Sequence, residues 1–195
     1  FGCPGWLQGM IQADYYIKSG DAKKILVIGT ETLSRVIDLH DRDSMIYADG
    51  AGATILESRE ADERPGILAH KTRSDTYRYA EMLTMGCSYN ITEENKQDLY
   101  LKMNGRRLYQ YALETVPLSI KACLDKAEVP IEKVKKVLIH QANGKMDDAI
   151  IDRLYKLYGY EEAPEGVMPM IISWLGNSSV ATVPTLLDLI LKNKV

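Results

Sequence analysis

The sequence has few cysteines and no long apolar run. Its three cysteines, Cys3, Cys87 and Cys123, are far apart and odd in number. This argues against a disulfide framework or a thiolate zinc site and favours a reducing compartment. No apolar run approaches the roughly 18 residues that span a bilayer, and the first residues lack the charged and apolar regions of a signal peptide. We therefore expect a cytoplasmic protein that is neither exported nor embedded in a membrane.

An excess of positive charge is also missing, and so is an initiator methionine. The formal net charge of -3 leaves no global basic field, so a nucleic-acid role has no electrostatic support. With 46% hydrophobic and 26% charged residues, the 195-residue chain can bury one or two compact cores. Because Phe1-Gly2-Cys3-Pro4 reads like the middle of an element, we expect a fragment of a longer protein.

The first third of the chain predicts one helix and two strands. Apolar residues recur at helical spacing over 6–17, and Ser19-Gly20 is typical of a helix end. The continuous apolar run 25–29 suits a strand covered on both faces, and 53–56 suits a second strand. The polar stretch 58–95 is rich in turn formers, which favours a connection between two halves.

The remainder alternates helices and strands. A long helical pattern covers 105–127 and is expected to kink or restart at Pro117. It is followed by a strand at 137–139, a helix at 147–158, an extended segment at 167–172 and a helix at 178–192 with Pro184 in its first turns. This order predicts a layered α/β fold.

Cys3 is the first candidate for chemistry. It stands at a predicted helix start, where exposed N–H groups and the helix dipole lower a cysteine pKa. Gly5 permits close approach of a ligand, and the Cys3 N–H is a candidate oxyanion donor. A lone cysteine is nevertheless more often structural than catalytic, and the short motif alone does not decide between the two.

His140 and Asn177 are the other two candidates. His140 directly follows a predicted strand, and such strand ends carry the sites of open α/β sheets. Its imidazole there either serves as general base or donor, or is a satisfied structural group. Asn177 precedes the last helix, so it is either an N-cap or an uncharged donor to a developing enolate.

Together these segments resemble the β-ketoacyl-acyl-carrier-protein synthase III family of thiolase-fold condensing enzymes. The shared motifs are Cys3-Pro4-Gly5-Trp6, His140-Gln141-Ala142-Asn143 and Gly176-Asn177-Ser178-Ser179, in the family's order. Residues 26–31, 41–42, 49–53 and 103–106 also fall in that order. The resemblance runs the length of the chain.

The resemblance implies a thiolase-like α/β/α/β/α fold with mixed sheets and buried helices, here incomplete. Residues 1–60 would be the remainder of the N-terminal half, carrying the nucleophile, and 61–195 the C-terminal half, carrying the histidine and asparagine. The family has about a hundred residues before its nucleophile and further strands after the position of Val195. We therefore expect the isolated chain to be inactive and the full-length protein to form a homodimer.

The resemblance also implies a reaction. Cys3 would take an acyl group from a coenzyme A thioester, and His140 with Asn177 would promote decarboxylation of malonyl-acyl carrier protein in fatty acid biosynthesis. No metal or cofactor is expected, because two neutral donors can stabilise the enolate. Arg42, Met103 and Asn143 are expected to bind coenzyme A.

Two positions bear on the carrier protein. Lys145 stands where the family has an arginine facing this partner, and lysine keeps the charge but loses the planar fork. Gln110 replaces a lysine that is common at the same face, which leaves the partner's identity open.

Three alternatives remain. One is an enzyme of secondary metabolism that uses an unusual starter, for which Pro4 and Trp6 would fit an altered acyl pocket. A papain-like cysteine protease shares the order Cys, His, Asn, but not the nucleophile motif. A non-catalytic subunit would be expected to lack Cys3 or His140, and both are present.

Overall fold

The computed structural model describes residues 1–60, 62 and 66–195. Its strands are β1 (Lys24–Thr32), β2 (Asp49–Glu57), β3 (Leu83–Gly86) and β4 (Tyr100–Met103). Its helices are α1 (Gly5–Ser19), α2 (Thr76–Tyr79), α3 (Gly105–Ala127), α4 (Gly144–Lys156), α5 (Ile172–Leu175) and α6 (Thr182–Leu191). The strands form two antiparallel pairs, β1 with β2 and β3 with β4.

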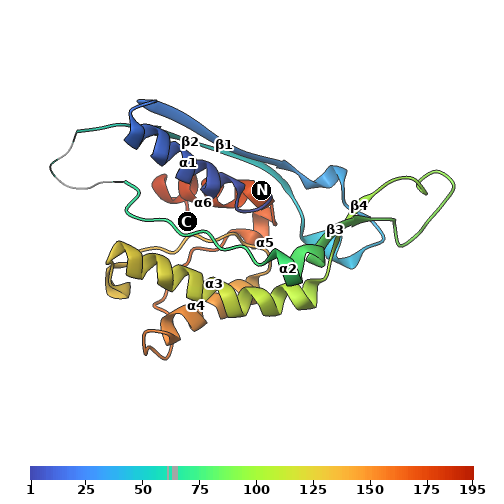
Figure 1. Ribbon diagram of the computed structural model, residues 1–195. Helices are drawn as coiled ribbons and strands as arrows, with labels where there is room; N and C mark the ends of the chain where they lie inside the picture. The colour runs from blue at the N-terminus through green and yellow to red at the C-terminus, as the bar shows by residue number, and fades with distance from the viewer. Residues whose placement is uncertain (61, 63–65) are drawn as a thin grey trace.

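Strands β1 and β2 lie along one side of the molecule, with α1 and α6 packed against the same face of the pair (Figure 1). The opposite face is bare among the described residues. Leu26 pairs with Ile55 there, and they are 56% and 69% exposed, while Ile28 is 57% exposed. The prediction of a strand covered on both faces is therefore wrong for the described chain. A continuous apolar run reports the hydrophobicity of both strand faces, not the presence of a cover on each.

Helix α1 has the predicted extent, and it ends because Gly20 adopts the left-handed conformation at φ 83°, where a glycine is favoured. Its buried side packs against β1. Trp6 is 5% exposed and contacts a core that includes Val27 and Val183. Trp6 therefore belongs to the core beneath the sheet, which gives no support to a role for it in an altered acyl pocket.

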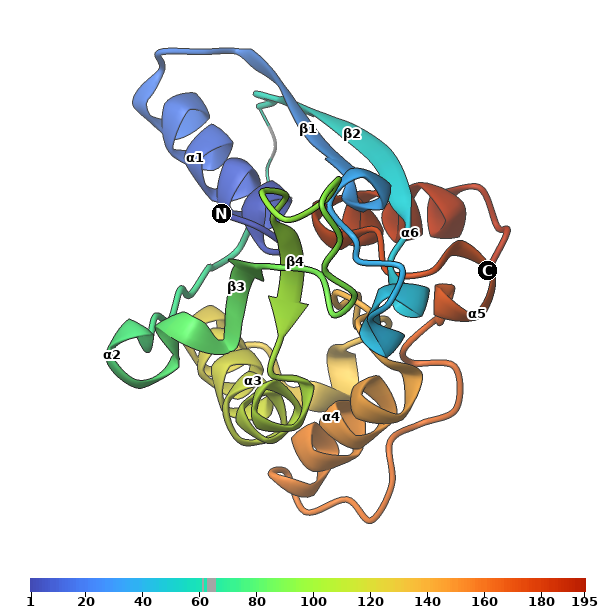
Figure 2. The ribbon, with the colours of Figure 1, turned by 90° about the vertical axis from the view of Figure 1, so that its right-hand side faces the viewer.

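Helices α3 and α4 pack against each other on the other side of the molecule (Figure 2). The core beside them includes Ile151 and the fully buried Leu154. Helix α3 runs unbroken through Pro117, so the predicted restart does not occur. Proline has no N–H to give to the carbonyl four residues earlier. That carbonyl, on Leu113, accepts a hydrogen bond from the Arg153 guanidinium of α4 at 3.2 Å.

Two predicted extended segments are not strands. Residues 137–139 and 167–172 are joined by one backbone hydrogen bond, from Val137 N–H to Val167 C=O at 2.8 Å, and no ladder forms between them among the described residues. The end of the second segment enters α5. Apolar content marked both segments as buried, but a strand needs a hydrogen-bonded neighbour as well.

The last helices differ from the sequence prediction at their starts. Helix α4 begins three residues early because Asn143 caps it, accepting a hydrogen bond from Met146 N–H at 3.3 Å. The predicted helix 178–192 is a short 3-10 turn, Ser179–Ala181, followed by α6. Pro184 lies in the first turn of α6, as predicted, where its missing N–H costs no helical bond.

A buried ion pair fixes the small β3–β4 sheet. Lys102 of β4 contacts the carboxylate of Asp38 at 2.6 Å, and Asp38 is 2% exposed. The same carboxylate accepts hydrogen bonds from Ser88 Oγ and Tyr89 N–H. This network joins the loop after β1 to the segment between β3 and β4, and Asp38 is held ionised by it.

The predicted division at residues 60 and 61 falls beside residues 61 and 63–65, which lie outside the described residues. It stays a prediction. Helix α6, from the predicted second half, packs on β2 of the first. Within the described ranges, no helix is long and apolar enough to cross a membrane.

Candidate active site

Cys3 lies at the start of α1, as predicted, two residues before Gly5 and next to the N-cap Pro4. Its sulfur accepts a hydrogen bond from Ser179 Oγ at 3.5 Å, although the two residues are at opposite ends of the chain. Burial opposes ionisation of the thiol, but hydrogen bonding and charge from His140, together with Ser179, outweigh it and lower the pKa of Cys3. A cysteine in such surroundings is suited to act as a nucleophile.

His140 lies in the irregular segment between Val137 and α4. The segment brings the imidazole to Cys3. The ring nitrogen Nδ1 is buried and has no hydrogen-bond partner among the described residues. Desolvation opposes the charged ring, yet the interactions with Cys3, supported by Asp147, raise the pKa of His140. Cys3 and His140 thus favour each other's charged forms, as in a thiolate–imidazolium pair.

The backbone holds Asn177 in place. Asn177 N–H donates to Ile46 C=O at 2.8 Å, and Ala48 N–H donates to Asn177 C=O at 2.9 Å. Gly176, at φ 67°, makes this approach possible, because a Cβ there would lie 2.9 Å from the Ala48 Cβ. The side-chain Oδ1 accepts from Ser179 N–H at 2.9 Å. This orientation leaves the amide N–H groups of Asn177 as donors.

Ser179 is the residue that joins the three predicted site residues. Its hydroxyl reaches Cys3, its N–H reaches Asn177, and its backbone acts on His140. It holds the left-handed conformation at φ 52°, which is uncommon for a residue other than glycine. The sequence includes Ser179 in a recognised motif, but the contacts that make it central depend on this local conformation.

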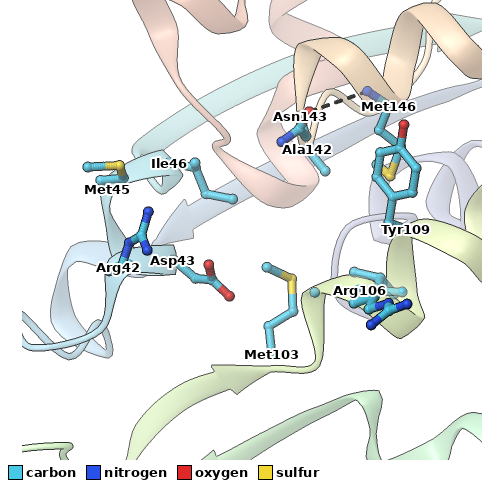
Figure 3. Close-up of a pocket in the computed structure, with 12 residues that line it drawn as sticks. Arg42, Asp43, Met45, Ile46, Met103, Arg106, Tyr109, Ala142, Asn143 and Met146 are labelled. Atoms are coloured by element: carbon cyan, nitrogen blue, oxygen red, sulfur yellow. Dashed lines mark hydrogen bonds between the residues drawn. The ribbon is translucent and has the colours of Figure 1, made fainter.

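A pocket of about 650 Å³ adjoins this cluster. Figure 3 shows Arg42 and Met103 on one side of it and Asn143 across from them. All three were predicted to bind coenzyme A, and the structure brings them together at this pocket. The complete lining is Arg42, Asp43, Met45, Ile46, Met103, Gly105, Arg106, Leu108, Tyr109, Ala142, Asn143 and Met146.

Tyr47 is near both the pocket residue Met103 and Cys3. Its hydroxyl donates to the sulfur of Met103 at 3.8 Å. Desolvation, followed by the negative charges of Asp43 and Cys3, raises the pKa of Tyr47 to about 12. Tyr47 therefore stays a neutral donor at physiological pH. Its sequence position before a strand gave no signal of this placement.

The two predicted carrier-protein positions lie outside the pocket lining. Lys145 is exposed in the first turn of α4. Gln110 is exposed on α3, where its amide donates to Glu114 at 3.3 Å. Both are accessible to a partner, and their role stays a prediction.

No group of three or more His, Cys, Asp or Glu side chains suited to a metal ion occurs within residues 1–60, 62 and 66–195. Whether the reaction needs a metal or cofactor stays a prediction from the sequence.

Comparison with known proteins finds similar sequences in one enzyme family. The family model described as 3-oxoacyl-[acyl-carrier-protein (ACP)] synthase III matches residues 1–76. The β-ketoacyl-[acyl-carrier-protein] synthase III of Streptococcus pneumoniae (strain Hungary19A-6) is 35% identical over 190 residues, which are 95% of this chain and 55% of that protein. The chain is therefore similar in sequence to synthase III enzymes. It spans about half the length of the curated relatives that it matches.

Solved structures of synthase III enzymes share the fold. The crystal structure of 3-oxoacyl-[acyl-carrier-protein] synthase III from Aquifex aeolicus VF5 superposes with a TM-score of 0.81 at 30% identity, over 100% of this chain and 57% of that one. The priming β-ketosynthase from the R1128 polyketide biosynthetic pathway gives 0.81 at 28% identity, over 97% of this chain and 55% of that one. The predicted thiolase-like α/β fold is confirmed.

Proposed function

We propose that this chain carries the active site of an acyltransferase that performs a decarboxylative Claisen condensation. The observation that carries the proposal is the meeting of Cys3, His140 and Asn177 around Ser179, from three motifs far apart in the sequence. The relatives named as synthase III enzymes support the same reaction. Because the matched relatives are condensing enzymes, the protease alternative is abandoned.

The first step acylates Cys3. Its thiolate attacks the carbonyl carbon of an acyl-coenzyme A thioester, the carbon–sulfur bond to coenzyme A breaks, and coenzyme A leaves as a thiolate that takes the proton of the His140 imidazolium, which becomes neutral. The lowered pKa of Cys3 increases the fraction of the thiol that is present as the nucleophilic thiolate. His140, in its charged form, stabilises the cysteine thiolate before the attack.

The second step uses the two donors. The malonyl thioester loses carbon dioxide, and the electron pair of the broken carbon–carbon bond forms an enolate. His140 and the Asn177 amide donate hydrogen bonds to the enolate oxygen. The enolate carbon attacks the acyl-cysteine carbonyl, and Cys3 leaves as a thiolate. The product is a β-ketoacyl thioester. Oδ1 of Asn177 is occupied by Ser179 N–H, so the amide presents its N–H groups for this task.

Arg42, Met103 and Asn143 would hold coenzyme A in the pocket, and Lys145 would contact acyl carrier protein. In the proposal the malonyl group arrives on that carrier protein, coenzyme A enters only as a substrate thioester, and no metal or cofactor takes part. The full-length protein would act as a homodimer in the cytoplasm. The starter is either that of fatty acid biosynthesis or, as the likeness to a priming β-ketosynthase of a polyketide pathway suggests, a different acyl group.

Acylation of Cys3 tests the proposal. The full-length protein is incubated with a panel of acyl-coenzyme A thioesters and its intact mass is measured. The wild-type protein is expected to gain one acyl group, and Cys3→Ser is expected to lose this adduct.

The matched control is Cys87→Ser, since Cys87 is an exposed free cysteine. It is expected to be acylated like the wild type. Acylation of Cys3→Ser at the wild-type rate would remove Cys3 from its role.

A further inference from the structure

Asp147 is a buried carboxyl that the proposed reaction leaves without a role. It lies in the first turn of α4 and is 0% exposed. Neither carboxyl oxygen makes a well-formed hydrogen bond among the described residues, although the backbone N–H groups of Asn143 and Ala142 are near enough to favour its charged form. Burying a carboxylate without partners is costly, and an apolar side chain of similar size would avoid that cost. The site therefore retains an ionisable group where stability alone would favour none.

The neighbour that explains Asp147 is His140. The two groups are seven residues apart in the chain, and their proximity raises the pKa of His140 and lowers that of Asp147. The imidazole Nδ1 is also buried without a partner among the described residues. These unpartnered groups are complementary: an imidazolium suits a carboxylate, and a neutral imidazole suits a protonated carboxyl. In a water-poor interior their interaction is stronger than at a surface.

We propose that Asp147 is a positioning residue that acts through His140: its buried carboxyl controls the charge on the imidazole, and thereby the fraction of Cys3 that is present as the nucleophilic thiolate. The inference deepens the proposed function, on which its catalytic consequence rests. The imidazolium form of His140 suits the attack by the Cys3 thiolate. The neutral form remains a donor to the enolate once Cys3 is acylated and no longer carries a charge.

The charges around this pair support the assignment. Desolvation raises the pKa of Asp147 to about 7, against the opposing effects of His140 and the N–H groups of Asn143 and Ala142. Exposed Asp148, its neighbour on α4, raises it further. The carboxyl therefore changes charge in the physiological pH range, and the two groups titrate as a pair.

Other titratable groups lie near both members of the pair. On His140 the main partner is Cys3. From α3, Arg106 and Tyr109 line the pocket with Met146, the residue before Asp147, but they are not among the groups with the largest effect on Asp147. The pH dependence of the nucleophile should therefore respond to Asp147 through His140.

Alkylation of Cys3 by iodoacetamide tests the inference, because it needs neither thioester substrate nor carrier protein. The rate is measured against pH on the full-length protein, with the modified peptide identified by mass spectrometry. Asp147→Asn removes the negative charge and so lowers the pKa of His140. The thiolate then loses support, and the midpoint of Cys3 alkylation is expected to rise by about half a pH unit or more.

Asp148→Asn is the matched control, since it makes the same change one residue away on the exposed side of α4. Its midpoint is expected to stay at the wild-type value or to fall slightly, because Asp148 raises the pKa of Asp147 and its loss leaves Asp147 more often charged. An unchanged or lowered midpoint in Asp147→Asn overturns the inference, and so does an equal rise in both variants.

Two further results distinguish a failure of the inference from a variant that does not fold and from a failure of the proposed function. If Asp147→Asn does not fold, selective ¹⁵N-histidine labelling of the wild type decides: the His140 ring signals should titrate in two steps, and a single step overturns the inference. A protein that shows the midpoint shift but forms no condensation product contradicts the proposed function alone. A protein that condenses without the shift contradicts the inference alone.

Discussion

Replacing Ser179 with alanine removes one hydroxyl and leaves the backbone contacts of that residue in place. The lost interaction is the hydrogen bond from Ser179 Oγ to the Cys3 sulfur at 3.5 Å, which favours the thiolate. Hydrogen bonds to charged groups contribute up to about 3 kcal/mol, and a long bond to sulfur belongs well below that limit, at about 1 kcal/mol. We therefore expect the pKa of Cys3 to rise by about 0.7 units.

The assay is the pH dependence of Cys3 alkylation, read from the same peptide in both proteins. Ser178→Ala is the matched control, because it removes a neighbouring buried hydroxyl that contacts Thr182 at 3.3 Å instead of Cys3. Its midpoint should not move. A Ser179→Ala protein that is folded and has the wild-type midpoint would refute the reasoning, since the Ser179 hydroxyl would then have no influence on the nucleophile.

The remaining predictions concern the fold. Arg153→Met leaves the Leu113 carbonyl without its donor and should lower the free energy of unfolding by about 0.5–1 kcal/mol in urea titrations; an unchanged value contradicts this role. Leu154→Ala empties a fully buried position and should cost about 2–5 kcal/mol by the same measurement, and a cost below 1 kcal/mol would show that the core collapses around the gap. The Asp38 network should contribute stability above about pH 4 that is lost as the pH falls, because desolvation is outweighed by Lys102 and the other donors, which lower the pKa of Asp38 in the folded state. Thermal melts of Asp38→Asn should lack that acid-side decline, and an identical decline would remove Asp38 as its source.

The candidate site residues could be named from the sequence because each stands in a short motif. Taken alone, Cys3, His140 and Asn177 each had a structural explanation, and only the order of the three motifs favoured a shared site; their catalytic roles stay a proposal. Ser179 was harder to predict, since its importance depends on a left-handed backbone and on contact with the far end of the chain. Asp147 gave no sequence signal, because one acidic residue near a helix start is ordinarily exposed.

Helices were predicted better than strands for a physical reason. The hydrogen bonds of α1 and α4 lie within the helix, so periodicity and caps determine most of their extent. A strand depends on a hydrogen-bonding partner elsewhere in the chain, which the local sequence does not identify. The apolar run at 137–139 makes one backbone hydrogen bond, to Val167, instead of a strand ladder. The run in β1 was judged covered on both faces, and only its inner face is.

Condensation with and without His140 tests the central claim most directly. The full-length protein is given an acyl-coenzyme A and malonyl-acyl carrier protein, and both carbon dioxide release and the acyl mass on Cys3 are followed. The wild type should release carbon dioxide and form a β-ketoacyl-acyl carrier protein. His140→Ala should still accumulate acyl-Cys3 but lose most of the condensation. Condensation at the wild-type rate in His140→Ala would contradict the account.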